Sequence, residues 1–123
     1  MKALVLLSSP RPQGNTSALT EILCDQLRQS GAQTEVISLY EKEIQPCVAC
    51  RGCQGDWSTF ACVRQDDVAA IAEKILDCDL IVLATPIYSW YCTPPMKALL
   101  DCAEYYLQIE DFSSEQVLEL HIE

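Results

Sequence analysis

Basic residues are scarce in this sequence. Eight Lys and Arg stand against eighteen Asp and Glu among 123 residues, which gives a formal charge of −10. Binding to the nucleic-acid backbone or to an anionic membrane surface needs clustered positive charge. We therefore expect neither nucleic acid nor a membrane among the partners. Long apolar runs are lacking as well, since none approaches the roughly 18 residues of a membrane-spanning helix.

Histidine and glycine are also sparse. His121 is the only histidine and lies close to the chain end, so no Ser-His-Asp or Cys-His arrangement can be built around it. The four glycines form neither a Walker loop nor a Gly-x-Gly-x-x-Gly fingerprint, which disfavours a nucleoside triphosphate and a Rossmann-type dinucleotide. We expect no hydrolytic activity, and the sequence singles out no catalytic side chain.

Short apolar runs alternate with helical patterns along the chain. Three runs predict strands: Ala3 to Leu7, Thr34 to Leu39 and Leu80 to Ala84. The first and third runs are continuously apolar, as strands buried on both faces are. Apolar residues at helical spacing follow, within 19–27, 68–76 and 96–107. This order predicts a single α/β domain over residues 1–123, with a doubly wound parallel sheet between two layers of helices.

Two chemically unusual loops follow the first and third predicted strands. The first loop, residues 8–17, carries hydroxyls, Arg11 and backbone N–H groups at a helix amino terminus, which together suit a phosphate monoester. The second loop, residues 85–95, carries three aromatic residues within four positions, which suggests contact with a planar ring. Ligands of such folds lie beyond the carboxyl ends of the strands, so the two loops should be neighbours in space.

Each loop also has a simpler interpretation. The first loop can be an ordinary capped loop, in which Thr16 or Ser17 is the N-cap of the following helix and no ligand is bound. In the second loop, the aromatic residues can pack under the next helix or at an oligomer interface.

Four of the eight cysteines are clustered. Cys47, Cys50, Cys53 and Cys62 have the spacing Cys-x2-Cys-x2-Cys-x8-Cys, which suits a four-iron cluster, a tetrahedral zinc site or a set of thiols. The remaining cysteines are interpreted as packed thiols, with Cys92 left open because it lies in the second loop. The apolar run after Met1 is too short for a signal-peptide core, so we expect a cytoplasmic protein with reduced thiols.

The runs SSPRPQGNT and ATPIYSWYCTPPMKALLD, with the order of elements between them, carry a resemblance to a known family. They resemble the NADPH-dependent FMN reductase-like branch of the flavodoxin-like superfamily, which includes iron–sulfur flavoproteins. The resemblance covers residues 1 to about 102 and leaves 103–123 as an atypical tail. It implies that the first loop holds the FMN phosphate and that the second loop wraps the isoalloxazine ring. The FMN-binding residues that it implies are Ser9, Arg11, Asn15, Thr16, Ser17, Pro86, Ile87, Tyr88, Ser89 and Trp90.

The same resemblance implies an NAD(P)H-dependent oxidoreductase. Hydride passes from NAD(P)H to bound FMN and then to a small electron acceptor or a redox protein, and the flavin itself carries the chemistry. For the clustered cysteines it is ambiguous, since iron–sulfur flavoproteins carry a compact four-cysteine motif here whereas cluster-free relatives keep several of the same cysteines. The alternatives are a small acidic flavin or iron–sulfur electron carrier and a truncated, non-catalytic, cysteine-rich metal-binding remnant.

The chain is short for such a fold. A flavodoxin-like sheet has five strands in the order 2-1-3-4-5, whereas only about three are evident here, and the C-terminal strands are expected to be missing or replaced. Residues 113–123 either start a helix through a capping-box pattern or alternate apolar and polar residues as a half-exposed strand does. A bare edge at the third strand is unfavourable, so we expect a truncated chain or one that is completed in a homo-oligomer.

Overall fold

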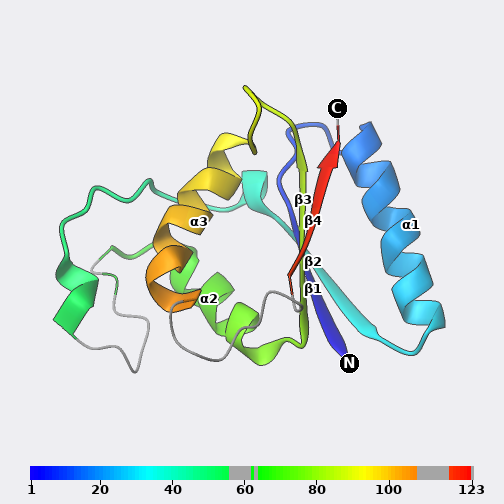
Figure 1. Cartoon of the computed structure of the whole chain (residues 1–123), viewed down its shortest axis with the longest axis horizontal. Helices are drawn as coiled ribbons and strands as arrows, with labels where there is room; N and C mark the ends of the chain where they lie inside the picture. Colours follow the sequence, from blue (N-terminus) through cyan, green and yellow to red (C-terminus); the bar gives the residue numbers. More distant parts are fainter. Residues whose placement is uncertain (56–61, 63, 108–116, 123) are drawn as a thin grey trace.

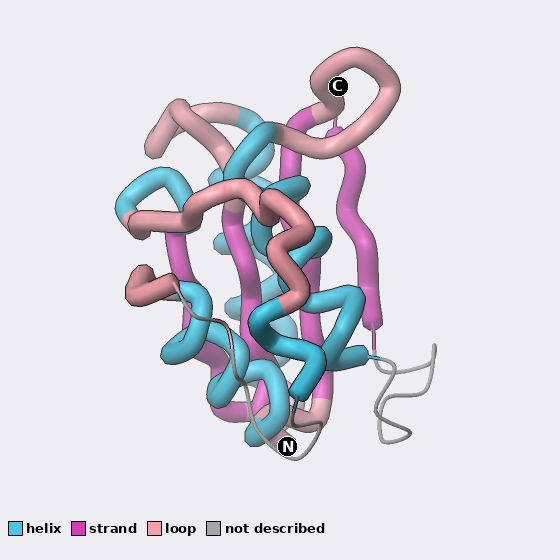
Figure 2. The backbone as a smooth tube through the Cα atoms, turned by 90° about the vertical axis from the view of Figure 1, so that its left-hand side faces the viewer, coloured by secondary structure: helices cyan, strands magenta, loops and turns pink. Residues whose placement is uncertain are grey.

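The computed structural model describes residues 1–55, 62, 64–107 and 117–122. Within this part of the chain, four parallel strands form one sheet in the order β2-β1-β3-β4. The strands are β1 (Lys2–Leu7), β2 (Gln33–Ser38), β3 (Leu80–Pro86) and β4 (Val117–Ile122). Figure 2 shows them side by side, with the loops after β1 and β3 at one end of the sheet.

Helices cover both faces of the sheet. One face carries α1 (Asn15–Gln29), and the other carries α2 (Val68–Asp77) and α3 (Pro94–Leu107), as Figure 1 shows. Two short 3-10 helices, η1 (Leu39–Glu41) and η2 (Gly52–Gly55), lie between β2 and α2. The predicted three-layer, doubly wound α/β fold is therefore confirmed. None of the helices in the described residues has the length and apolar character needed to cross a membrane.

The apolar runs of β1 and β3 become strands because both of their faces are covered. Leu4 and Leu6 of β1 point into the larger core cluster, with α2 and α3. Val5 points the opposite way and packs with Val82 of β3 and Cys24 of α1. Val5 and Val82 have no exposed surface at all. Because side chains alternate along a strand, each of these strands contributes to two cores, one on each side of the sheet.

The sequence pattern of residues 113–123 was compatible with either a helix or a strand. Residues 117–122 form a strand, in keeping with the alternating pattern, and it pairs with β3 from Ile81 with Val117 to Pro86 with Ile122. The sheet therefore has four strands where about three are evident from the sequence. The unfavourable bare edge at β3 therefore does not occur, because β4 hydrogen-bonds along it within the same chain.

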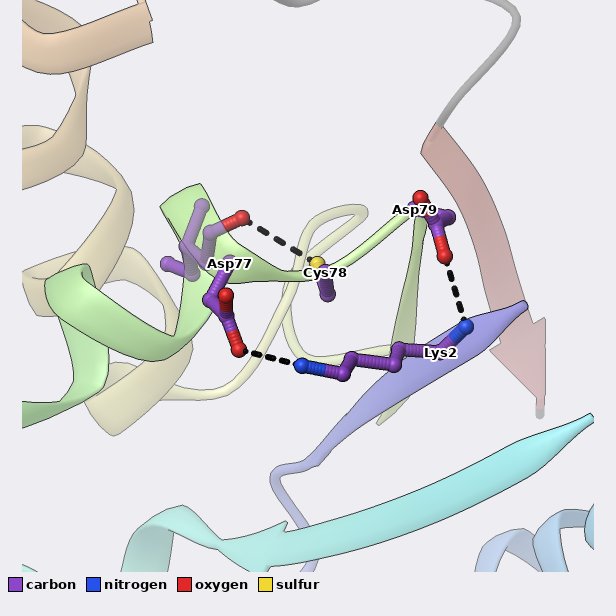
Figure 3. Close-up of polar contacts among 5 residues, drawn as sticks. Lys2, Asp77, Cys78 and Asp79 are labelled. Atoms are coloured by element: carbon purple, nitrogen blue, oxygen red, sulfur yellow. Dashed lines mark hydrogen bonds and ion pairs between the residues drawn. The ribbon is translucent and has the colours of Figure 1, made fainter.

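Lys2 joins the amino ends of β1 and β3 (Figure 3). Its backbone N–H donates to the Asp79 carboxylate at 2.7 Å, and the Asp79 N–H donates to the Lys2 carbonyl at 2.9 Å. The Lys2 ammonium forms an ion pair with Asp77 at 2.9 Å. These contacts fix the turn between α2 and β3 against the start of β1. They lie at the end of the sheet opposite to the two loops that sequence analysis singled out.

Candidate functional site

The first and second loops meet beyond the carboxyl ends of β1 and β3, as predicted (Figure 1, upper end of the sheet). The Ser8 hydroxyl lies 2.5 Å from the Thr93 hydroxyl, and Thr93 also donates to the Ser8 carbonyl at 2.9 Å. The Thr93 N–H donates to the Thr85 hydroxyl at 3.1 Å. All three residues are buried. A buried hydroxyl network therefore joins the two loops.

A cleft of about 340 Å³ opens between the two loops. Its volume lies within the range of small-molecule sites in proteins. Seven of the ten residues expected to bind FMN line it: Ser9, Arg11, Asn15, Thr16, Pro86, Ile87 and Tyr88. Pro10 and Gly14 complete the wall. The structure thus brings a polar loop and an apolar loop to opposite sides of one cleft.

The polar side of the cleft is prepared for an anion. Helix α1 begins at Asn15 with Gly14 as its N-cap, and no side chain caps its first N–H groups. The alternative that Thr16 or Ser17 caps the helix is therefore wrong, because both are buried inside its first turn. Among the described residues, the Arg11 guanidinium forms no ion pair. A helix amino terminus and an unpaired guanidinium together attract a phosphate.

Gly14 lies close to Arg11. A Cβ at this position would lie 3.2 Å from the Arg11 Cβ and 3.4 Å from the Arg11 carbonyl oxygen. The first contact is tighter than an ordinary one, so a larger residue would require Arg11 to shift by a few tenths of an ångström. The Gly14 N–H donates to that same carbonyl at 3.2 Å. This compact turn holds the N–H groups of α1 open toward the cleft, and the residues present therefore fit the phosphate end of FMN.

Three of the ten expected FMN residues do not line the cleft. Ser17 is buried behind the first loop, where its hydroxyl donates to the Arg11 carbonyl at 3.2 Å. Ser89 and Trp90 form a two-residue turn, with φ of 49° and 68°, closed by two hydrogen bonds between Tyr88 and Tyr91. Trp90 is 96% exposed. Positive φ at two consecutive non-glycine residues is strained, and such strain is concentrated at functional sites.

Tyr40 is a residue near the cleft that sequence analysis missed. It lies in η1, directly after β2, with its phenol near Thr93 and near Tyr88 of the cleft wall. Burial raises the pKa of Tyr40 above its ordinary value; Thr93 lowers the pKa by a smaller amount, and Tyr88 raises it. Its position after a predicted strand was the available signal, because all parallel strands end at the same edge of the sheet.

The four clustered cysteines form a second candidate site, because they line one cavity of about 40 Å³. Cys102 of α3 lines it too, although the sequence pattern gave Cys102 only a packing role. The pKa of Cys102 is raised to about 11, mainly by burial and to a smaller extent by the nearby Cys47 and Cys62 thiols. Five of the eight cysteines therefore surround one space, four from the loop and one from a core helix.

The cysteine loop is tied to the start of α2. The Asp67 carboxylate accepts the Glu43 N–H at 2.7 Å, and the Asp66 carboxylate accepts the Gln45 N–H at 3.0 Å. The Arg64 guanidinium donates to the Pro46 carbonyl at 2.8 Å. Asp66 also accepts the Val68 N–H at 3.0 Å, at the first turn of α2. Residues 43–46, at the start of the cysteine loop, are thus hydrogen-bonded to residues 64–67 at its end.

Binding of a single metal ion requires several of these sulfur atoms to converge on one centre. Among the described residues, which include all eight cysteines, no three Cys, His, Asp or Glu groups are placed to hold one metal ion. Zinc needs four sulfurs at about 2.3 Å from one centre. In a four-iron cluster each cysteine binds a different iron, so the sulfurs stand further apart around a larger space. Within the described residues, the loop cysteines therefore do not converge on a single metal ion.

Local backbone geometry also suits a cluster. Ala49 and Arg51 have φ of 55° and 63°, and the Ala49 N–H donates to the Cys47 sulfur at 3.4 Å. Turns of this kind point backbone N–H groups into a concavity that holds anions and iron–sulfur clusters. Arg51 and Arg64 line the same cavity. The residues present therefore fit an anionic group bound through sulfur.

Cys24 and Cys78 lie away from both sites. Cys24 is buried against β1 and β3, and burial raises its pKa above the ordinary value. Cys78 is half-buried, donates to the Ile75 carbonyl at 3.1 Å and also has a pKa raised by burial. The prediction of packed thiols is confirmed for these two residues.

The strand order, the covering helices and a cleft beyond the carboxyl ends of β1 and β3 define a flavodoxin-like protein. Comparison with known families gives the finer assignment. The sequence model of the family described as NADPH-dependent FMN reductase matches residues 1–118, and the chain belongs to this family.

Individual relatives agree with this assignment. An iron–sulfur flavoprotein of Methanocaldococcus jannaschii is 36% identical over 101 residues, which cover 82% of this chain and 51% of the relative. An iron–sulfur flavoprotein of Archaeoglobus fulgidus is 32% identical over 101 residues, with 82% and 44% covered. The chain thus spans about half the length of the curated relatives it matches. The fold is similar to that of an NAD(P)H:quinone oxidoreductase of Methanothermobacter marburgensis, with a TM-score of 0.71 at 20% identity, covering 86% of this chain and 54% of the other.

Proposed function

We propose that the cleft between the first and second loops binds FMN and that the protein is an NAD(P)H-dependent oxidoreductase. One observation carries the proposal: an uncapped helix terminus and an unpaired Arg11 face an apolar loop across a cleft of about 340 Å³. FMN has a dianionic phosphate at one end and a planar ring at the other. The family to which the chain belongs is described by the same cofactor.

Each wall of the cleft has its own task in this proposal. Arg11 and the N–H groups of Asn15 and Thr16 bind the phosphate, with Ser9 beside them and Ser17 supporting the loop from behind. Pro86, Ile87 and Tyr88 contact the ring and exclude water from one side of it, and the turn of Ser89 and Trp90 extends that wall. The bound flavin supplies hydride and single-electron chemistry.

Flavin titrations test the proposal. The chain is titrated with FMN and with riboflavin, which lacks the phosphate, and binding is followed by quenching of flavin fluorescence. We expect FMN to bind at least about tenfold more tightly, which is about 1.4 kcal/mol from the phosphate. Anaerobic NADPH or NADH should then bleach the bound flavin. Equal affinity for the two flavins, or no binding of either, would contradict the phosphate site.

A second candidate function concerns the cysteine cavity, which we propose holds a four-iron cluster. The supporting observation is that five cysteines and two arginines line one cavity. Four thiolates and four bridging sulfides complete such a cluster. Anaerobic reconstitution should give about four iron and four sulfide per chain, with a broad absorption near 400 nm. A chain that takes up zinc but no iron would contradict it.

Location and assembly complete the proposal. The exposed thiols of Cys47 and Cys50 suit a reducing compartment, so we place the protein in the cytoplasm. The 96% exposure of Trp90 beside the cleft suits an oligomer interface, so we expect a homo-oligomer. A nicotinamide nucleotide is the electron donor, and a small molecule or a redox protein is the acceptor.

A further inference from the structure

We propose that a groove between α1 and the edge strand β2 binds a small organic cation, an ammonium or guanidinium group on an apolar body. The groove has a volume of about 500 Å³, which lies within the range of small-molecule sites. It is separate from the FMN cleft, although both adjoin the first loop: Pro12 and Ser17 line the groove, whereas Arg11 and Asn15 line the cleft. The inference does not depend on flavin binding.

The groove exists because α1 does not extend over β2. Within the described residues, α1 is the one helix on its face of the sheet (Figure 1), and a helix about 10 Å wide covers about two strands. Val5 of β1 and Val36 of β2 are partners in the sheet register, so their side chains point to the same side. Val5 has no exposed surface, whereas Val36 is 43% exposed. An apolar side chain on the helix-covered face therefore remains open to a ligand.

The floor of the groove is apolar and includes a buried thiol. Leu7, Val36 and Cys24 line it. Cys24 is 2% exposed, and within the described part of the chain its thiol makes no hydrogen bond. Such a thiol behaves as a small hydrophobic group, and sulfur packs favourably against aromatic rings. The floor thus suits the apolar body of the ligand, and an aromatic body best.

The rim of the groove carries an excess of negative charge. Glu21, Asp25 and Glu41 line it against one basic residue, Arg28. Arg28 pairs with Asp25 at 3.4 Å, whereas Glu21 and Glu41 form no ion pair with any described residue. Two unpaired carboxylates attract a cation and repel an anion. The rim therefore selects the charge of the ligand.

Helical spacing brings the charged rim and the floor together. Cys24, Asp25 and Arg28 follow Glu21 at the intervals of three, four and seven positions that share one face of a helix. Glu41 lies in η1, directly after β2, on the other side of the groove. A cation between the two walls can thus approach carboxylates while its body contacts the floor.

Calorimetric titrations with three matched probes test the selection of charge. Phenethylamine is a cation, phenethyl alcohol is neutral and hydrocinnamate is an anion, and all three share one aromatic body. We expect the amine to bind at least about tenfold more tightly than the alcohol, and the anion to bind weakest. Equal affinity for the amine and the alcohol would overturn the inference. Displacement of the amine by FMN would place the amine in the cleft and would also overturn it.

Substitutions at the rim test the position of the site. Glu21→Gln and Glu41→Gln should each weaken binding of phenethylamine at least about threefold, because each removes one carboxylate, and leave phenethyl alcohol unaffected. Arg28→Gln should instead strengthen binding of the amine about twofold, because it removes the basic residue of the rim. Glu73→Gln is the control, at an exposed carboxylate of α2 on the other face of the sheet. Equal weakening by Glu73→Gln, or no weakening by either rim variant, would overturn the inference.

Filling the groove is a test that leaves charge unchanged. Val36→Phe adds bulk to the floor and suits a strand, so all three probes should bind at least about fivefold more weakly. Leu76→Phe is the control, because Leu76 is 50% exposed on α2. Unchanged binding of phenethylamine to Val36→Phe would overturn the inference. If Val36→Phe does not fold, the rim variants decide, because Glu21 and Glu41 are exposed and their substitution disturbs no packing.

Discussion

The Ser8 hydroxyl, at the end of β1, lies 2.5 Å from the Thr93 hydroxyl, before the first turn of α3, although 85 positions separate the two residues. Thr93 also donates to the Ser8 carbonyl, and Thr93 has no exposed surface. Water cannot replace a partner that is lost from such a place. The alignment of the two walls of the cleft therefore depends on this contact.

Replacing Thr93 by Val tests that dependence, because Val keeps the shape of the side chain and removes the hydroxyl. The substitution leaves the Ser8 hydroxyl and carbonyl without this partner, so the free energy of unfolding should fall by about 2–3 kcal/mol. Urea denaturation measures it. The double variant Ser8→Ala with Thr93→Val should lose less than the sum of the two single variants, because both remove the same contact.

Thr34 of β2 provides a matched control with the opposite expectation. Its hydroxyl oxygen is buried and has no hydrogen-bond partner. Thr34→Val removes that unpaired atom and suits a strand, so the free energy of unfolding should be unchanged or slightly higher. A similar loss in Thr34→Val and Thr93→Val would mean that the hydroxyl network contributes nothing specific.

Arg11→Gln should weaken FMN binding by about 10- to 100-fold, because it removes a charged partner of the phosphate. Riboflavin binding should stay within about twofold, since riboflavin has no phosphate to lose a contact. Fluorescence titration measures both. Arg28→Gln is the control, because Arg28 lies in the last turn of α1 and pairs with Asp25. Equal weakening of both flavins by Arg11→Gln would show that Arg11 supports the fold of the loop instead.

Local sequence signals were sufficient for the centre of the fold. The continuous apolar runs of β1 and β3 need both faces covered, and that condition alone implies a parallel sheet between helices. Strand β4 was harder, because Val117–Ile122 is short and its alternating pattern competes with a capping signal nearby. Only pairing with β3 decides between the two, and pairing is a tertiary property.

In the two candidate sites too, some residues are predicted by local sequence signals and others are placed only by tertiary packing. Seven of the ten expected FMN residues line the cleft, because short loops after neighbouring strands must meet. The N-cap of α1 is Gly14, where the first loop turns back on itself through the Arg11 carbonyl; propensity alone did not choose Gly14 over Thr16 or Ser17, because all three residue types are favoured at N-caps. Cys102 and Tyr40 reach their sites through the packing of α3 and the path of the chain after β2. Neither contact has a signature in the spacing of residues along the sequence.

The thiol of Cys24 should make stability depend on pH in the alkaline range. Burial against β1 and β3 raises its pKa in the folded state above the ordinary value of 9.0. The stabilisation is complete below pH 9.0 and is lost as the pH rises through the folded-state pKa, because the unfolded chain ionises first. Cys24→Ala should flatten the decline of the unfolding free energy as the pH rises above 9.0. Cys50→Ala, at an exposed thiol, should leave that slope unchanged.

We expect the strained turn of Ser89 and Trp90 to lower the stability of the protein and to serve a function at the cleft. Both residues have positive φ, and Trp90 is 96% exposed, so Ser89→Asn with Trp90→Gly loses little packing and suits the turn better. The free energy of unfolding should rise by about 1 kcal/mol. Gln26→Gly, on the exposed side of α1, should instead lower it by about 1 kcal/mol, because glycine gains nothing where φ is helical.

If the turn extends the ring-binding wall, the stabilised variant should also bind FMN more weakly, and fluorescence titration would detect this. A more stable variant with unchanged FMN affinity would assign the strain to a partner surface, since the exposed indole would then serve neither the fold nor the flavin.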